Sequence, residues 1–204
     1  MGSSPASGSP TVDDQLTRRR LLELGLVLPL VAAGCSGNET EALAPTPACA
    51  DGDEPTPDQT EGPFFTPDSP ERKSLLEPGM EGTPLVLTGV VLATDCTPIS
   101  GALVDFWHAD AAGEYDNDGY RLRGHQFAST QGRYRLETIE PGLYTGRTRH
   151  IHVKAQAPNG PVLTTQLYFP GEPGNANDSI FDPALVMSIS EAGARHFDFV
   201  LARG

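Results

Sequence analysis

Two histidines stand one residue apart in a short stretch that otherwise has the composition of a strand. The stretch covers residues 147–155 and reads RTRHIHVKA. Side chains of a strand alternate between its two faces, so His150, His152 and Lys154 share one face. Two imidazoles at adjacent positions on one face are suitably spaced to be neighbouring ligands of one metal ion. Two surface histidines on a half-exposed strand are the alternative interpretation.

Two tyrosines in glycine-containing loops are further candidates for chemistry. Tyr115 lies in AAGEYDNDGY and Tyr144 in EPGLYTG. Tyr134 and Tyr168 fall in expected strands, where packing is sufficient reason for an aromatic ring. A tyrosine in a loop is not explained by packing within a strand, although each of these two could equally be a packed or hydrogen-bonded ring.

Four segments, taken together and in order, indicate a family. They are TEGPFF (60–65), DFWHADAAGEY (105–115), IEPGLYTGRTRHIHVKA (139–155) and LTTQLYFPGEP (163–173). With these segments the chain resembles the intradiol ring-cleavage dioxygenases, the group of protocatechuate and catechol dioxygenases, from about residue 60 to residue 201. The order and spacing carry the resemblance, because no single segment is decisive.

The resemblance implies one non-haem Fe(III) per chain, held by two tyrosines and two histidines. Tyr115 matches the family's first tyrosine, eight residues after Trp107, and Tyr144 matches the P-G-x-Y tyrosine. His150 and His152 match the H-x-H pair. Anionic phenolate oxygens suit a hard ferric ion and offset two of its three charges. Hydrolytic zinc sites use histidine, cysteine or carboxylate instead.

The resemblance also implies the reaction and the residues beside the iron. A catechol-type ring would be cleaved with O2 between its two hydroxyl-bearing carbons, giving a cis,cis-muconate-type product without an organic cofactor. Arg147 matches an active-site arginine that would stabilise developing negative charge. Gln166 matches a glutamine that hydrogen-bonds near the iron, and Tyr144 is the tyrosine that leaves the metal and takes a proton. The alternatives are a surface ion pair of Arg147 with an acid such as Glu140, and a plain strand role for Gln166.

Two other functions are compatible with parts of the sequence. Residues 89–107 also resemble the start of small surface β-sandwich modules that bind without catalysis, although such a module needs neither the loop tyrosines nor Arg147. A Zn(II) or Fe(II) enzyme would combine the histidine pair with a carboxylate such as Asp105 or Asp116.

The loop at residues 116–126 contains polar and basic groups that a carboxylate on the substrate ring could meet. A solvated loop is the alternative interpretation. In the histidine strand, Thr148 and Arg149 stand where family members often have Pro-Ala, and we expect Arg149 to be solvated. The loop residues concerned are Tyr120, Arg121, Arg123 and His125.

Short strands must position these residues. Residues 125–130 and 132–139 are expected to pair across a turn at Gln131 and Gly132, and residues 72–77 are the helical candidate of the folded part. With 19 prolines and 22 glycines among 204 residues, the chain is predicted to be all-β, a β-sandwich of mainly antiparallel strands with long active-site loops. The expected strands cover residues 84–95, 101–110, 125–130, 132–139, 149–157, 162–169 and 195–202.

Residues 1–35 are predicted to be an export signal with a lipobox. Three arginines at 18–20 precede an apolar run over residues 21–33, and VAAGC would make Cys35 the lipidated first residue of the mature protein. TRRRLL favours the twin-arginine route, with general secretion and an ordinary cleaved signal as alternatives. We therefore expect an exported protein on the periplasmic or cell-surface side, bound to the membrane through the lipid on Cys35.

Residues 36–59 are predicted to be a disordered tether rich in proline and acidic residues, and residues 60–204 to be the intradiol dioxygenase-like domain. Cys49 and Cys96 predict a disulfide in an exported chain, with two free thiols as the alternative. The net charge of −13 argues against a nucleic acid as a partner. The expected partners are a catechol-type small molecule and O2.

Overall fold

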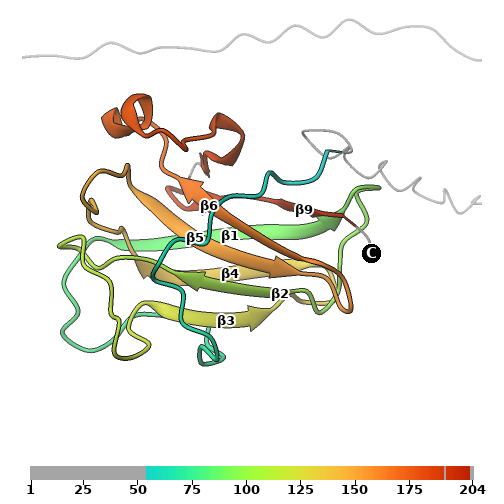
Figure 1. The fold of residues 1–204 in the computed structure, drawn as a ribbon. Helices are drawn as coiled ribbons and strands as arrows, with labels where there is room; N and C mark the ends of the chain where they lie inside the picture. Colours follow the sequence, from blue (N-terminus) through green and yellow to red (C-terminus); the bar gives the residue numbers. More distant parts are fainter. Residues whose placement is uncertain (1–53, 191, 203–204) are drawn as a thin grey trace, which may run out of the picture. The chain divides into compact units, whose positions relative to one another are not determined.

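The protein is described by a computed structural model that covers residues 54–190 and 192–202. These residues form two β-sheets that share one apolar core (Figure 1). One sheet contains β4 (Arg133–Ile139), β1 (Pro84–Ala93), β8 (Arg195–His196) and β7 (Ser188–Ile189), with β9 (Phe199–Leu201) also paired to β1. The other has the order β3 (Arg123–Phe127), β2 (Leu103–Trp107), β5 (His150–Gln156) and β6 (Val162–Tyr168).

Antiparallel pairing dominates, which confirms the predicted β-sandwich. Every pair of the four-stranded sheet is antiparallel, whereas β1 pairs in parallel with the short strands β8 and β9. The long connection between β6 and β7 contains two short 3-10 helices, η1 (Pro173–Asn177) and η2 (Pro183–Leu185). No helix within the described residues is long and apolar enough to cross a membrane.

The alternation predicted for the histidine strand is confirmed. Ile151, Val153 and Ala155 of β5 are fully buried in the core between the two sheets. Because side chains alternate along a strand, this apolar row turns His150 and His152 to the outer face of the four-stranded sheet. Burial of the apolar row therefore fixes which way the imidazoles point.

The prediction that residues 125–130 and 132–139 form a hairpin is wrong. β3 pairs with β2 and β4 pairs with β1, so the turn at Gln131 and Gly132 connects one sheet to the other. Gly132 adopts a left-handed φ of 70° there, as a tight turn requires. Turn chemistry is the same for a hairpin and for a connection between sheets, and burial of the two strands decides between them.

Two other segments differ from their predictions. Residues 72–77 are not helical: Ser74 forms an isolated bridge to Glu137, and the adjacent Leu75 is completely buried in the core. The predicted last strand is divided into β8 and β9. β8 pairs with Leu87 and Thr88 of β1, and β9 pairs with β1 further along, from Val91 to Ala93. In both cases a long-range contact overrides the local pattern.

The end of the predicted tether belongs to the folded unit. Thr56 N–H donates to the Val200 carbonyl (2.9 Å), Val200 N–H donates to the Thr56 hydroxyl (2.8 Å), and Gln59 N–H donates to the Thr164 carbonyl (2.8 Å). Residues 54–59 are thus ordered, because their backbone satisfies groups that edge strands would otherwise expose. Residues 1–53 lie outside the described part of the chain, so the export signal, the lipid on Cys35 and the remaining tether stay predictions.

Cys96, in the connection between β1 and β2, is disulfide-bonded. Its predicted partner, Cys49, lies outside the described residues. The bond rules out the alternative of a free thiol at Cys96.

A buried histidine at the end of β2 makes the stability of the domain sensitive to acid. Nδ1 of His108 lies 2.7 Å from the Ala109 carbonyl oxygen, and Nε2 lies 2.7 Å from the Thr138 hydroxyl oxygen. Burial lowers the pKa of His108 to about 4. The unfolded chain takes up this proton near pH 6.5, so the stabilisation is complete above that pH and is lost as the pH falls towards 4.

We expect the free energy of unfolding to fall by about 3 kcal/mol between pH 7 and pH 4 on account of His108. Urea unfolding of the wild type and of His108→Gln across this range measures the contribution. The variant should show a shallower pH dependence, and equal slopes for the two proteins would contradict the assignment.

Candidate active site

The outer face of β5 and the loop after β2 bring three of the predicted ligands together. Nε2 of His150 lies 3.1 Å from Nε2 of His152 and 3.2 Å from the hydroxyl oxygen of Tyr115. Trp107 pairs directly with His152 across β2 and β5, and the two rings stack 4.9 Å apart at 9°. The stacked indole of Trp107 holds the imidazole of His152 in place. The register of β2 and β5 places this imidazole beside the loop that contains Tyr115.

Both histidines have the neutral form that binds metal ions. Nδ1 of His150 lies 2.6 Å from the Thr148 carbonyl, which assigns the proton to Nδ1 and leaves the lone pair of Nε2 directed at His152 and Tyr115. Burial lowers the pKa of His150 to about 4 and lowers the pKa of His152 well below its ordinary value. Neither ring therefore needs to lose a charge before it coordinates a cation.

The two tyrosines have different environments. Burial raises the pKa of the Tyr115 phenol, and the positive charges of Arg147 and Arg123 offset this in part. Tyr144 lies edge-on to Tyr115, with ring centroids 5.8 Å apart, and is 36% exposed. Phe64 stacks on Tyr115 at 4.3 Å and meets Tyr144 edge-on at 5.3 Å. Tyr144 is thus the more exposed of the two tyrosines.

The donor set fits a ferric ion. The two Nε2 atoms are separated by 3.1 Å, which is close enough for both to serve as ligands of one metal ion. Two imidazole lone pairs that face each other at this distance repel unless a proton or a cation lies near both. Phenol oxygens complete a set that favours a hard cation, because binding would stabilise the phenolate that burial disfavours.

A carboxylate-containing metal site is not supported. Within residues 54–190 and 192–202, no group of three or more histidine, cysteine, aspartate and glutamate side chains could hold a metal ion. Asp105 accepts a hydrogen bond from the Ser69 hydroxyl (2.8 Å). Asp116 accepts hydrogen bonds from the backbone N–H groups of its own loop, including that of Arg121 (2.8 Å). Both carboxylates proposed for the Zn(II) or Fe(II) alternative are therefore engaged in holding loops.

Arg147 and Gln166 interact directly. The Nη2 group of Arg147 donates to Oε1 of Gln166 (2.7 Å), and Nε donates to the Asp178 carboxylate (2.8 Å). Gln166 is buried in β6 opposite His152, so it lies beside the histidine pair. The alternative partner of Arg147, Glu140, pairs with Arg195 instead (3.1 Å).

The segment at residues 60–65 runs across the same face. A Cβ atom on Gly62, which has φ of 72°, would lie 3.4 Å from Cε1 of His152, so the backbone passes close to the imidazole. Lys154 holds this segment: its Nζ lies 3.5 Å from the Phe65 ring centroid and 2.5 Å from Glu61. The position of Lys154 on the histidine face was visible in the sequence, but its partners were not.

The basic groups proposed to meet a substrate carboxylate are engaged. Arg123 is buried and donates to the carbonyls of Phe64 (2.5 Å) and Asp116 (2.6 and 3.0 Å). Nδ1 of His125 lies 3.1 Å from the Ser69 hydroxyl. Tyr120 donates its hydroxyl to the Pro67 carbonyl (3.0 Å).

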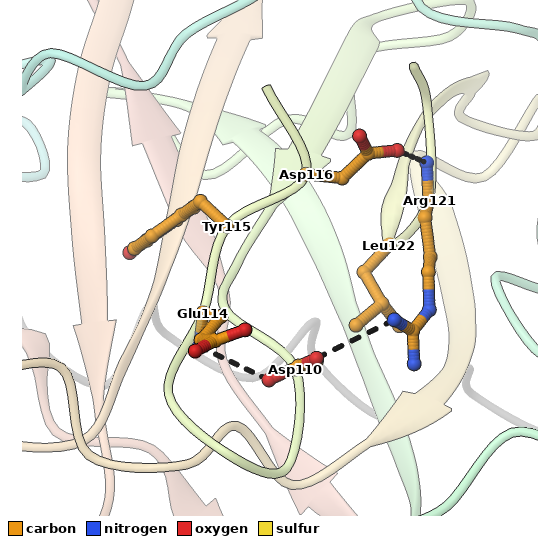
Figure 2. A pocket seen from close by; sticks show the side chains of 6 residues that line it. All are labelled: Asp110, Glu114, Tyr115, Asp116, Arg121 and Leu122. Atoms are coloured by element: carbon orange, nitrogen blue, oxygen red, sulfur yellow. Dashed lines mark hydrogen bonds and ion pairs between the residues drawn. The ribbon is translucent and has the colours of Figure 1, made fainter. Parts of the chain in front are cut away.

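Figure 2 shows the remaining loop arginine in its pocket. Arg121 pairs with Asp110 (3.4 Å), and both residues line a cavity of about 270 Å³. The side chain of Tyr115 points away from the acidic side chains of this cavity (Figure 2). Arg149, expected to be solvated, is paired with Glu172 (2.8 Å) and donates to the Pro141 carbonyl. That expectation is wrong, because the turn before Tyr144 and the segment after β6 both reach Arg149.

Comparisons with known proteins agree on one family. The Dioxygenase family model (Dioxygenase_C) matches residues 60–201. The chlorocatechol 1,2-dioxygenase of Pseudomonas sp. (strain P51) is 31% identical over 173 residues, which are 70% of this chain and 69% of that protein. The protocatechuate 3,4-dioxygenase beta chain of Burkholderia cepacia is 36% identical over 118 residues, 49% of this chain and 50% of that one. The chain thus spans between half and about seven tenths of these curated relatives.

Solved structures show the same relationship. The dioxygenase domain of a dioxygenase–carbohydrate-binding protein fusion from Streptomyces sp. SirexAA-E is 57% identical, with a TM-score of 0.70 over 74% of this chain and 100% of that one. The 3-chlorocatechol 1,2-dioxygenase of Rhodococcus opacus 1CP is 30% identical, with a TM-score of 0.66 over 72% of each chain. The family match over nearly all of the described residues, together with these relatives, shows that the chain belongs to the intradiol ring-cleavage dioxygenases.

Proposed function

We propose that the protein is a non-haem Fe(III) dioxygenase that cleaves a catechol-type ring between its two hydroxyl-bearing carbons with O2, giving a cis,cis-muconate-type product. The convergence of the Tyr115 oxygen and the two histidine Nε2 atoms carries the proposal. Tyr115, Tyr144, His150 and His152 would hold one iron. A ferric ion held there would supply Lewis-acid activation of a catechol-type substrate toward O2.

The side chains around the iron divide the remaining work. Tyr144, the exposed tyrosine, is the base that takes a proton from a substrate hydroxyl. Arg147 stabilises negative charge as it develops on the substrate, and Gln166 orients its guanidinium. Phe64 packs against both tyrosines and keeps water away from Tyr115. A binding module without catalysis would have no need for this arrangement.

The test of the proposal is a visible absorption spectrum with a measurement of iron content. Tyrosinate bound to Fe(III) absorbs visible light, and the band should shift when catechol is added without oxygen. Zinc, or an empty binding module, gives no such band. A protein that stays colourless after ferric reconstitution would refute the iron–tyrosinate site.

We further propose that the substrate ring carries no carboxylate. Arg121, Arg123 and His125 are each engaged by other groups, and Lys154 is paired with Glu61. A substrate carboxylate would therefore either displace one of these interactions or lie without a cation. An unpaired charged group in a partly buried site costs about 1–3 kcal/mol or more.

This proposal predicts that kcat/KM for catechol exceeds that for protocatechuate by about 10- to 100-fold. Initial rates of product formation with both substrates measure the ratio. A third substrate, 4-methylcatechol, separates charge from size and should behave like catechol. Equal or faster turnover of protocatechuate would show that a basic group of the site accepts the carboxylate after all.

A further inference from the structure

We propose that Asp178 is a positioning residue that fixes both the guanidinium of Arg147 and the entry of the histidine strand. This role rests on the function proposed above for Arg147. Asp178 follows η1 in the connection between β6 and β7, 30 residues along the chain from Thr148. No sequence motif connects the two segments.

The carboxylate of Asp178 lies inside the protein and accepts three hydrogen bonds. Its side chain is 1% exposed. Oδ2 accepts from Nε of Arg147 (2.8 Å) and from the backbone N–H of Thr148 (2.9 Å), and Oδ1 accepts from the backbone N–H of Ile180 (3.1 Å). Burial by itself raises the pKa of Asp178, but the N–H of Thr148 and the guanidinium hold it below its ordinary range. A charged hydrogen-bond acceptor is therefore kept in a site with little water.

These contacts determine how Arg147 is presented. A guanidinium is planar and rigid, so fixing two of its nitrogens fixes the direction of the third. Asp178 holds Nε and Gln166 holds Nη2 (2.7 Å). Gln166 is in turn held by its own donation to the Thr60 carbonyl (2.9 Å). Nη2 also donates to the Tyr168 hydroxyl (3.5 Å), so the orientation of Arg147 is determined by two residues of β6 and one residue beyond η1.

The same carboxylate also acts on the metal side of the site. Thr148 donates its N–H to Asp178, and its carbonyl accepts the Nδ1 proton of His150 (2.6 Å). The backbone of Thr148 therefore connects Asp178 to the imidazole through two successive peptide groups and supports the tautomer that leaves Nε2 free. The carboxylate of Asp178 therefore positions both the guanidinium of Arg147 and, through Thr148, the proposed iron ligand His150.

Asp182 provides a matched comparison four residues later. Its Oδ1 accepts a hydrogen bond from Ala184 N–H (2.9 Å) and caps η2, and it makes no contact with Arg147 or Thr148 among those found in the described residues. Both aspartates therefore hold backbone in the same connection, but Asp178 alone of the two also reaches the site. Asp182→Asn therefore controls for the loss of a loop-holding carboxylate in this connection, while the Arg147→Gln background tests whether Asp178 acts through Arg147.

The experiment is a double-mutant cycle on the iron-loaded protein. Asp178→Asn keeps the size of the side chain and removes its charge, and we expect kcat for catechol to fall by about 10- to 100-fold. The Kd for catechol, measured by anaerobic absorbance titration, should change by less than about 3-fold, because the loss concerns charge stabilisation during the reaction. Asp182→Asn should leave kcat within about 2-fold of the wild type.

The decisive comparison is made in an Arg147→Gln background. If Asp178 acts on the rate mainly through Arg147, Asp178→Asn should cost less than about 3-fold in kcat there, because interacting residues are not additive, whereas its effect on His150 through Thr148 should persist as a displaced visible band. A full additional loss in that background, or a loss equal to that of Asp182→Asn in the wild type, overturns the proposal. Should Asp178→Asn not fold, the same cycle is run with Asp178→Glu, which keeps the charge. A wild-type protein that, loaded with iron, cleaves neither catechol, 4-methylcatechol nor protocatechuate would refute the proposed function itself, before any variant is compared.

Discussion

Replacing Tyr115 with phenylalanine should lower kcat/KM for catechol by about 1000-fold or more. The ring can keep its stacking on Phe64, 4.3 Å away, so packing changes little. The variant loses the oxygen that lies 3.2 Å from Nε2 of His150 and with it a proposed anionic ligand of the iron. Metal activation is worth several kcal/mol, and each 1.4 kcal/mol corresponds to a factor of ten in rate, so a defective site loses about three orders of magnitude.

The measurement combines rate, iron content and the visible spectrum per iron. Tyr115→Phe should bind less iron, and the band should be weaker and displaced for whatever iron is retained. Tyr120→Phe is the matched control in the same loop: its hydroxyl donates to the Pro67 carbonyl at the surface, and its loss should leave rate and spectrum nearly unchanged. A Tyr115→Phe protein that keeps a tenth or more of the activity (roughly 1.4 kcal/mol of barrier) would remove Tyr115 from the ligand set.

Replacing Arg147 with glutamine should lower kcat by about 100- to 1000-fold while the fold persists. Loss of one preorganised group that stabilises developing charge has effects of this size. Arg147 is fixed on both sides, by Asp178 and by Gln166, so it does not need to reorganise as the charge develops. Because the interaction forms mainly in the transition state, kcat and kcat/KM should fall together.

Arg147→Lys separates charge from geometry. Lysine keeps the positive charge but has no planar fork to satisfy Asp178 and Gln166 at once, so an intermediate loss is expected. Arg135→Gln, an exposed arginine of β4 paired with Glu137, controls for removal of a surface charge and should have no measurable effect on kcat. Equal activities of Arg147→Gln and the wild type would show that Arg147 only forms an ion pair with Asp178 and does not stabilise charge during the reaction.

Local features of the sequence determine the chemistry that β5 presents. The alternation of histidine with isoleucine and valine decides that one face is apolar, and its burial sends His150 and His152 outward together. The alternation is predictable because it depends on neighbours within a few residues and on period-two geometry. The tyrosine candidates, Tyr115 and Tyr144, are assigned from the resemblance to the intradiol dioxygenases and not from strand geometry.

The partners of these residues depend on contacts between segments far apart in the chain. β3 and β4 are consecutive and joined by a tight turn, yet they enter different sheets, because β3 pairs with β2 and β4 pairs with β1. Residues 72–77 have a helical composition, but burial of Leu75 holds them extended. Local propensities are worth less than the burial of one large side chain, so they lose where the two conflict.

The surroundings of the site show the same division. The sequence identified Arg147 and Gln166, whereas their contact, the neutralisation of Arg149 by Glu172 and the carboxylate of Asp178 became visible in the fold. An acid in a loop rich in glycine and asparagine looks like any solvated residue. Asp178 is an internal counter-charge because the connection after β6 brings it to Arg147 and Thr148, just before β5. The residue types that do chemistry are thus legible in the chain itself, while their charge state and orientation are decided by the segments that tertiary structure packs against them.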